Sequence, residues 1–330
     1  VTKEVAQTGV SSKGAWDVNS TGSNYELHDT AYATTLTPGS ILSDISEWSY
    51  DSVSFSIAAQ EANPYGIALN NNGTKLYIVG LTGQDVNEYS LSTAYDLSTA
   101  SFTTNFSVAT EEAGPTNLTF NNDGTKMYII GQSGDEINQY SLSTAYDIST
   151  ASFDAVTFSV ASEDTGPQRM VFNNDGTKMY VLGSTGDDVN QYSLSTAYDI
   201  STASFDSVTF SVGTQDTAPM DLAFNADGTK MFILGENGDD INQYSLSTAF
   251  DISTASFDSL TFSIASQEAT ARGMVFSDDY TKMYIVGNTT DTVYQYTTGS
   301  EALILGSGSF ASTDVGKRIV GNGGEAILTA

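Results

Sequence analysis

Carboxylates recur in this sequence at spacings that acid–base catalysis or Ca²⁺ binding could use. Two turns read Gly-Asp-Asp, at 186–188 and 238–240, and two loops carry Glu-Asp at 163–164 and Gln-Asp at 215–216. Paired carboxylates can work as general acid and base, and oxygen-rich loops suit Ca²⁺. A catalytic centre, however, needs several different functional groups at a single site, whereas these turns recur in the same form in more than one repeat. We therefore interpret them as structural turns and predict no catalytic residue, no metal and no cofactor.

The other residue types of chemical interest are scarce. The chain has no cysteine and a single histidine, His28, so it offers neither thiolates nor a histidine cluster. Its formal net charge is −29 with only 11 Lys plus Arg, a balance that repels phosphate backbones and excludes nucleic acid as a partner. No apolar run is long enough to insert in a membrane.

One lysine and one aromatic residue return at fixed places. The lysines are Lys75, Lys126, Lys178, Lys230 and Lys282. Three of them follow a turn aspartate, Asp123, Asp175 or Asp227, and we predict charge pairing across that hairpin. The aromatic residues Tyr146, Tyr198 and Phe250 are predicted to pack a long connection against its own repeat.

These residues must be positioned by the repeat that carries them. The phrase N-x-D-G-T-K-M-Y recurs around Gly73, Gly124, Gly176 and Gly228, and a fifth copy has Tyr280 in the glycine position. Successive copies are separated by 51, 52, 52 and 52 residues. A fixed period of this size indicates a solenoid, a propeller or an array.

The content of one repeat decides between these architectures. In the third repeat, short apolar runs at 169–172, 178–182 and 188–194 are separated by turn residues. A longer connection then leads to 207–212, which alternates apolar and polar residues as an outer edge would. Four short antiparallel strands without a helix make one blade of a β-propeller. We predict an all-β fold.

Counting strands predicts five blades. The first three strands occur five times, beginning near Tyr65, Thr116, Gln168, Met220 and Arg272. The fourth strand also occurs five times, but its first copy, at 53–57, precedes every first strand. We therefore predict that this N-terminal strand completes the last blade as its outer strand and closes the ring. A sixth blade built partly from 25–42 is the less favoured alternative.

The repeat phrase resembles two groups of known sequences. F-N-x-D-G-T-K-M-Y-(V/I)-x-G-x-x-G-D-x-(V/I)-x-x-Y is similar to the blade signature of YVTN-type, lactonase-like propellers, over about residues 50–298. The whole block, including S-L-S-T-A-Y-D-I-S-T-A-S-F, more closely resembles repeats of marine bacteriophage tail-fibre and tail-associated proteins. The glycine-rich C-terminal segment is similar to linkers of phage adhesins. Propellers host binding, structural and enzymatic members alike, so the resemblance implies a fold before it implies an activity.

The repeats differ where the first strand begins, and this variation points to a binding surface. In a propeller these positions lie at the mouth of the central channel, on the same face as the variable second turns at Leu81, Gln132, Ser184, Glu236 and Asn288. Drift at exposed positions is the alternative explanation. We expect the mouth residues to be exposed, and alanine substitutions there to cost under about 1 kcal/mol. The predicted ligand-binding residues are Tyr65, Asn117, Gln168, Arg169, Met220, Asp221 and Arg272.

These observations give one interpretation of the whole chain. Residues 1–49 are predicted to pack on the ring and link it onward, with Trp16 and Trp48 as anchors. Residues 50–298 form the propeller, and residues 299–330 form a glycine-rich connector.

We expect a non-enzymatic binding or structural module of an extracellular particle, in a virion or extracellular setting. A phage tail fibre or receptor-binding protein that recognises a host-surface glycan or receptor fits best. Other virion or surface subunits and a homo-oligomer are the expected partners. The alternatives are a lactonase-like or polysaccharide-lyase-type enzyme and a bacterial surface adhesin or filament subunit.

Overall fold

The computed structural model describes residues 45–299 with their side chains. Beyond that range it describes the backbone of residues 4–6, 16–18, 24–27, 36–42, 300–305, 318–321 and 324–327. The chain divides into two compact units, and Asp44–Asp278 with Lys282–Thr297 form the unit that holds the repeats.

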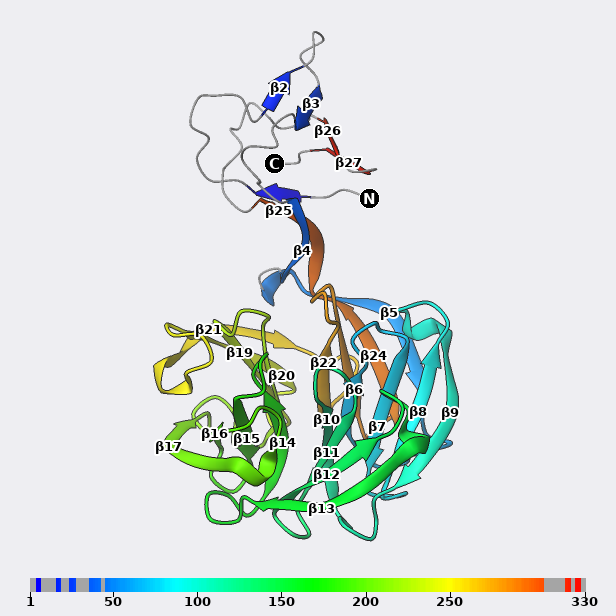
Figure 1. The fold of residues 1–330 in the computed structure, drawn as a ribbon, viewed down its shortest axis with the longest axis vertical. Helices are drawn as coiled ribbons and strands as arrows, with labels where there is room; N and C mark the ends of the chain where they lie inside the picture. Colours follow the sequence, from blue (N-terminus) through cyan, green and yellow to red (C-terminus); the bar gives the residue numbers. More distant parts are fainter. Residues whose placement is uncertain are drawn as a thin grey trace. The chain divides into compact units, whose positions relative to one another are not determined.

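This unit contains five four-stranded antiparallel sheets, so the predicted five-bladed β-propeller is confirmed (Figure 1). Blade 1 consists of β6 (Pro64–Leu69), β7 (Lys75–Gly80), β8 (Asp85–Leu91) and β9 (Ala100–Ser107). Blade 2 consists of β10 (Pro115–Phe120), β11 (Lys126–Gly131), β12 (Glu136–Leu142) and β13 (Ala151–Ser159). Blade 3 consists of β14 (Pro167–Phe172), β15 (Lys178–Gly183), β16 (Asp188–Leu194) and β17 (Ala203–Ser211). Blade 4 consists of β18 (Pro219–Phe224), β19 (Lys230–Gly235), β20 (Asp240–Leu246) and β21 (Ala255–Ser263).

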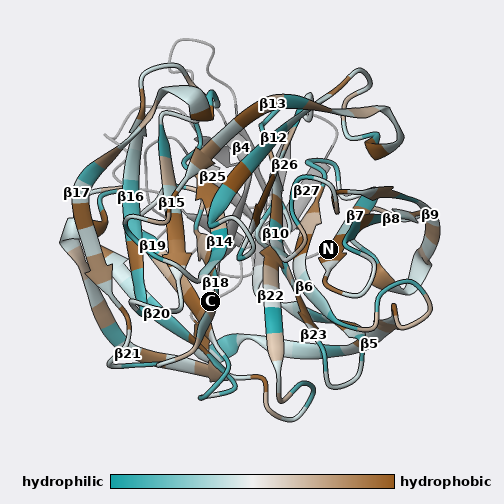
Figure 2. Cartoon of the chain, turned by 90° about the horizontal axis from the view of Figure 1, so that it is seen from below, coloured by the Kyte–Doolittle hydropathy of each residue, from teal (hydrophilic) through white to brown (hydrophobic). Residues whose placement is uncertain are grey.

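Blade 5 closes the ring with a strand from the other end of the propeller sequence. Its strands are β22 (Ala271–Phe276), β23 (Lys282–Gly287), β24 (Thr292–Thr297) and, outermost, β5 (Ser49–Ser56). The register pairs Tyr296 with Tyr50 and Thr292 with Ser56. Each innermost strand contacts the innermost strands of both neighbouring blades, so the five surround one axis (Figure 2). The predicted closure is confirmed, because β24 gains its outer partner only from β5.

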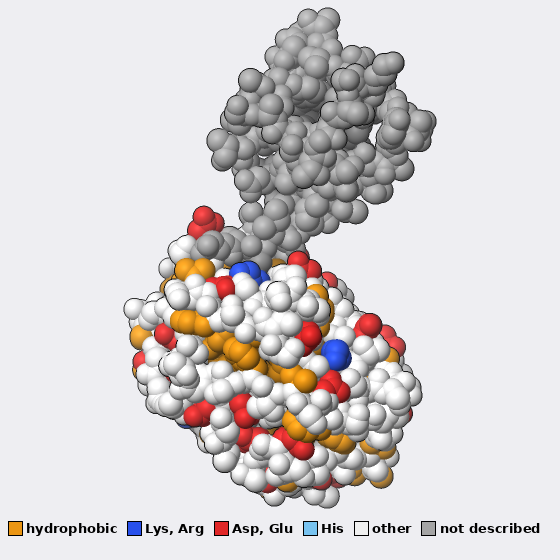
Figure 3. Space-filling model, turned by 90° about the vertical axis from the view of Figure 1, so that its left-hand side faces the viewer, with side chains coloured by type: hydrophobic (Ala, Val, Ile, Leu, Met, Phe, Trp, Pro, Cys, Tyr) orange, Lys and Arg blue, Asp and Glu red, His pale blue; other side chains and the backbone are white. Residues whose placement is uncertain are grey.

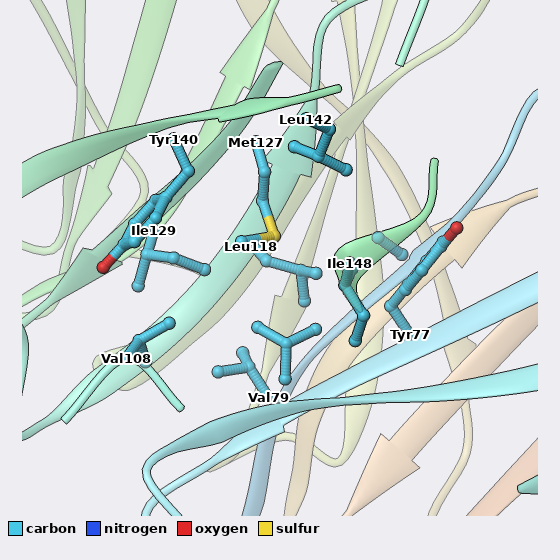
Figure 4. Close-up of a cluster of buried hydrophobic side chains, with 11 residues drawn as sticks. Tyr77, Val79, Val108, Leu118, Met127, Ile129, Tyr140, Leu142 and Ile148 are labelled. Atoms are coloured by element: carbon cyan, nitrogen blue, oxygen red, sulfur yellow. The ribbon is translucent and has the colours of Figure 1, made fainter. Parts of the chain in front are cut away.

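The hydrophobic core of the propeller lies between neighbouring blades. The middle strands are buried on both faces, whereas the outer strands alternate between half-buried and exposed residues. Figure 4 shows one interblade cluster, in which Tyr77 and Val79 of blade 1 pack against Leu118, Met127 and Ile129 of blade 2. Burial on two faces explains why these strands read as continuous apolar runs.

The connection between the third and fourth strands differs from its prediction in one respect. It contains a three-residue 3₁₀ turn, such as Ile148–Thr150, which Asp147 caps by accepting the Ser149 backbone N–H. The outer strand then begins at Ala151, inside the segment predicted to be connection. None of the helices in the described part of the chain is long and apolar enough to cross a membrane.

The repeated aromatic residues pack as predicted, and their backbone carbonyls also accept a hydrogen bond from the neighbouring blade that the sequence did not indicate. The Tyr146 ring covers Gly124, where a Cβ would lie 2.2 Å from the ring and φ is +69°, so only glycine fits. The Tyr146 hydroxyl donates to the Asn122 carbonyl of its own blade at 3.1 Å. Its backbone carbonyl accepts the buried hydroxyl of Tyr77 from blade 1 at 2.6 Å. Such bonds link neighbouring blades at four of the five seams.

The seam between blades 4 and 5 is different, because Phe232 replaces the hydroxyl donor. At this seam Trp48 packs against Phe232, Phe262 and Phe276, with ring centroids 5.3–5.7 Å apart. The Trp48 side chain thus packs on the ring, while its predicted role as an anchor for residues 1–49 stays a prediction. The side chain of Trp16 lies outside the residues whose side chains are described.

The predicted pairing of the repeated lysines is wrong. Lys126 contacts Asp154 at 3.2 Å, and Lys178 and Lys230 make the same contact with Asp206 and Asp258 of their own outer strands. The turn aspartates instead accept bonds from a threonine two residues on, as Asp123 does from Thr125. An outer-strand carboxylate is a better partner because each bulge directs it back across the sheet.

The second unit contains the described strands outside the propeller. One sheet has the order β1 (Glu4–Ala6), β25 (Gly299–Leu305) and β4 (Leu36–Leu42). Another has β2 (Trp16–Val18), β3 (Asn24–Leu27), β26 (Arg318–Gly321) and β27 (Gly324–Ile327). Because β3 and β4 belong to separate sheets, the alternative of a sixth blade from 25–42 is wrong. The glycine-rich part of the predicted connector, 306–317, lies outside the described residues.

Candidate functional site

The varying residues lie at the start of the innermost strands, where each blade has a local irregularity. In blade 3 the register between β14 and β15 shifts between Pro167 and Arg169, which leaves Gln168 unpaired in the ladder. The second turn lies beside this point, since Ser184 donates its backbone N–H to the Gly166 carbonyl at 3.0 Å. The same bond recurs in every blade. The predicted placement of both sets on one face is therefore confirmed.

Arg169 and Asp221 form an ion pair at the axis, called here the axis pair. The Arg169 Nε lies 3.0 Å from Asp221 Oδ1, although its N–H does not point at that oxygen. Asp221 Oδ2 accepts the Met274 backbone N–H at 2.6 Å, and Arg169 Nη1 donates to the Ile67 carbonyl at 3.4 Å. Side chains from β14 and β18 thus bind backbone groups of β22 and β6.

Burial dominates the electrostatics of this pair. The Asp221 residue is 1% exposed. Burial raises its pKa to about 6 even though Arg169 opposes the shift. Burial also lowers the pKa of Arg169, and the Asp221 charge partly offsets that change. Both charged groups are buried, so each depends on the other and on its backbone partners.

Nearer the surface, Arg272 is held between an acid and an aromatic ring. Its Nη1 and Nη2 donate to the two carboxylate oxygens of Glu236 at 2.6 and 2.8 Å. Its guanidinium carbon lies 5.1 Å from the centroid of the Tyr65 ring, and Nη1 lies 3.1 Å from Met220 Sδ. The Arg272 side chain is 14% exposed and that of Glu236 is 25% exposed. We call Tyr65, Met220, Glu236 and Arg272 the mouth cluster.

The remaining predicted residues are not part of either group. Gln168 donates to Ser184 Oγ at 2.9 Å, and the buried Oδ1 of Asn117 lacks a hydrogen-bond partner among the described residues. Gly66 lets β6 approach β10 closely, since a Cβ there would lie 2.7 Å from the Asn117 Cα.

The expectation that the mouth residues are exposed is wrong for five of the seven. Asn117, Gln168, Arg169, Met220 and Asp221 are all buried, whereas Tyr65 and Arg272 are half-buried. The tight packing of five inner strands around one axis leaves little room, so side chains that project toward it fill the centre.

Glu236 is the mouth residue that the sequence-based set of ligand-binding residues missed. It was noted only as a variable second-turn residue. The signal was that blade 4 alone has an acid at this position, while blade 5 alone has an arginine at the second residue of its inner strand.

The candidate Ca²⁺ ligands have a structural role. Asp164 is buried and accepts the backbone N–H groups of Gly166 and Gly186, at 2.6 and 2.8 Å, which joins the two loops of blade 3. Asp216 does the same with Ala218 and Gly238. Within residues 45–299, no three His, Cys, Asp or Glu side chains could hold a metal ion together.

The acidic surface extends beyond these loops. Figure 3 shows many acidic side chains and few basic ones on one face of the propeller. In the turns, burial and neighbouring carboxylates raise the pKa of Asp187, beside Asp216 and Asp164. Burial and neighbouring carboxylates likewise raise the pKa of Asp135 and that of Asp291.

Comparison with known proteins finds similar solved structures but no matching family. No model of a known protein family matches the sequence, and no curated protein matches it either. Among solved structures, the chain is similar to a functionally unknown protein from Desulfotomaculum acetoxidans, with 15% identity, 81% of this chain and 75% of that chain covered, and a TM-score of 0.46. It is also similar to the periplasmic gluconolactonase of Pseudomonas aeruginosa, with 16% identity, 75% of this chain and 72% of that chain covered, and a TM-score of 0.42. A third similar structure is a luciferin-regenerating enzyme, with 14% identity, 78% of this chain and 97% of that chain covered, and a TM-score of 0.45.

These names require one correction. The prediction that the chain is not an enzyme is contradicted, because similar structures include proteins named as a gluconolactonase and a luciferin-regenerating enzyme. The lactonase-like part of the resemblance agrees with these names, whereas the phage part gains no support from them. At these identities and TM-scores, no conclusion about the activity of this chain is taken from the similar structures.

Proposed function

We propose that the channel mouth binds a host-surface glycan through the mouth cluster. The single observation that carries the proposal is the accessible arrangement of Arg272, which is bonded to both Glu236 oxygens and lies over the Tyr65 ring. A planar fork held in place by an acid has little rotamer freedom left to lose on binding. Half-buried aromatic and polar groups on rigid loops are what ligand sites commonly present.

The chemistry of the cluster favours a neutral, hydroxyl-rich ligand. Glu236 already neutralises Arg272, and the chain carries a net charge of −29, so an anion would meet repulsion. A sugar offers hydroxyls that can donate to the Glu236 carboxylate and accept from the guanidinium. Its apolar ring face can pack on the exposed part of Tyr65.

The test measures binding to a glycan array and to host cells for Tyr65→Ala, Arg272→Ala and Glu236→Gln. At least one variant is expected to bind more than about tenfold more weakly, since a few residues usually carry most of the binding energy. Lys178→Ala, which also removes a half-exposed cation, serves as the control. Parent-like binding by all three variants would place recognition elsewhere. Because the non-enzymatic prediction was wrong, turnover of lactones is measured with the same proteins.

For the wider setting we propose a virion or extracellular surface, with a phage tail-fibre or receptor-binding role as the first candidate. The support is the repeat phrasing of the sequence and its acidic composition. Detection of the protein in purified particles by mass spectrometry tests this setting. Its absence from particles, together with presence on a cell surface, would favour an adhesin instead.

A further inference from the structure

Among the described residues, no strand pairs with the outer edge of any blade, and the outer strands of four of the five blades carry features that hinder such pairing. A free edge presents unpaired backbone groups that can accept a strand from another chain, and inward-pointing charges and bulges prevent this. β5, β13, β17 and β21 each have an aspartate turned inward onto a lysine, at 2.6–3.2 Å. The residue after each aspartate has a φ between 56° and 60°. These residues are Ser52, Ala155, Ser207 and Ser259.

The outer strand of blade 1, β9, has neither the inward aspartate nor the residue with positive φ, and its bulge is one residue smaller. It reads Ala-Ser-Phe-Thr-Thr-Asn-Phe-Ser, without a charged residue, and is one residue shorter than β13. Its register shift opposite Glu88 and Tyr89 leaves out only Thr103. Because β9 has no aspartate, Lys75 contacts Glu88 of β8 at 2.8 Å instead. The shorter first interval of 51 residues in the sequence reflects this difference.

An apolar side chain is exposed on the same strand. Phe102 is 42% exposed and is the one large hydrophobic residue in that state among the side chains described. Its equivalents Phe153, Phe205 and Phe257 are half-buried. β9 forms the outer margin of its sheet, beyond β8, with no described strand on its other side (Figures 1 and 2).

Charge indicates which partner this edge can accept. Two copies of a chain with a net charge of −29 repel each other over most of their surface. An uncharged edge is where they can approach, and the one lysine near it is already neutralised by Glu88. A strand that pairs antiparallel with its own copy places the same uncharged residues opposite one another across a two-fold axis.

We propose that β9 pairs antiparallel with β9 of a second copy of this chain. The two blade 1 sheets then form one continuous sheet, and Phe102 is packed at the new interface. The contact is smaller than a standard protein interface, so the dimer dissociates on dilution.

Sedimentation velocity across a dilution series tests the proposal. The parent is expected to shift from dimer to monomer as it is diluted. The decisive variant replaces Ala100–Ser107 with the nine residues of β17, Ala-Ser-Phe-Asp-Ser-Val-Thr-Phe-Ser, and carries Glu88→Gln so that Lys75 can pair as in other blades. This variant should be monomeric with an unchanged melting temperature, while Glu88→Gln alone should still dimerise.

Cross-linking locates the contact. The chain has no cysteine, so single-cysteine variants react at one place only. Ser101→Cys and Thr103→Cys should give dimers with a short bis-maleimide, whereas the control Ser152→Cys, at the equivalent exposed position of β13, should not. A parent that stays monomeric at every concentration overturns the proposal. So does a dimer that survives the β17 graft, or equal cross-linking at Ser152.

Discussion

Arg169 and Arg272 lie one position apart in equivalent inner strands, and each is paired with a carboxylate from a neighbouring part of the ring. The axis pair is buried and bonded to the backbones of β6 and β22. The pair of Arg272 and Glu236 is partly exposed and lies over Tyr65. A shift of one residue along the strand therefore separates an ion pair that joins four blades from one that is partly exposed to solvent.

The comparison teaches that burial, rather than residue type, distinguishes the structural pair at this mouth from the pair proposed to bind a ligand. Removing one partner of a buried pair leaves a charge without water or counter-charge, and this costs several kcal/mol. A partly exposed pair contributes little to stability, because water replaces the lost partner. The two arginines should therefore respond oppositely in folding and in binding measurements.

The largest expected effect comes from Arg169→Met. At pH 8 this change leaves Asp221 ionised, buried and unpaired, and we expect it to lower the free energy of unfolding by about 3–5 kcal/mol. Urea unfolding followed by circular dichroism measures this. A loss under about 1 kcal/mol would make the axis pair equivalent to the exposed one and would remove the distinction.

The pH dependence of that loss is the next largest effect. The pKa of Asp221 is raised in the folded chain to about 6, so its contribution to stability is present below about pH 4 and is lost as pH rises through about 6. Arg169 holds this pKa down. Its removal should raise the pKa further, and each unit of rise costs about 1.4 kcal/mol at high pH.

Arg169→Met should consequently destabilise the protein less at pH 5, where Asp221 is protonated, than at pH 8. Urea unfolding of the parent and the variant at both values measures the difference. Equal costs at the two pH values would show that Asp221 does not titrate in this range.

Much of this fold was predictable because the repeats solve one packing problem five times. The period, the turn glycines and the number of fourth strands predicted the blades and their closure by β5. The partner of Lys126 was not predictable from its neighbours, because Asp154 lies 28 residues away and a bulge brings it back. Local spacing favoured Asp123, which the turn itself uses.

The mouth was predicted only in outline. Variation among repeats found Tyr65, Arg169, Asp221 and Arg272, since packing does not require the same residue there in every blade. Their depth depends on how closely five strands approach one axis, and no single repeat encodes that distance. Glu236 was missed because its partner Arg272 lies 36 residues away in the next blade.

A smaller effect is expected when both charges of the axis pair are removed together. Arg169→Met with Asp221→Asn removes both buried charges of the axis pair and keeps an oxygen that can accept the Met274 N–H. We expect this double variant to recover at least about 2 kcal/mol of the loss caused by Arg169→Met, as for other buried pairs replaced by neutral groups. Urea unfolding at pH 8 compares the three proteins. A double variant as unstable as Arg169→Met would attribute the loss to packing instead of charge.

The smallest effect on folding is expected at Arg272. Arg272→Ala leaves Glu236 with enough exposure to be hydrated, and the Tyr65 ring remains in place, so unfolding free energy should change by under about 1 kcal/mol. Binding to glycans or cells should nevertheless weaken by about tenfold, which corresponds to about 1.4 kcal/mol. Unfolding and binding are measured on the same preparation, with Arg169→Met beside it. A loss of stability at Arg272 as large as at Arg169, without loss of binding, would make both arginines structural and would refute the proposed site at the mouth.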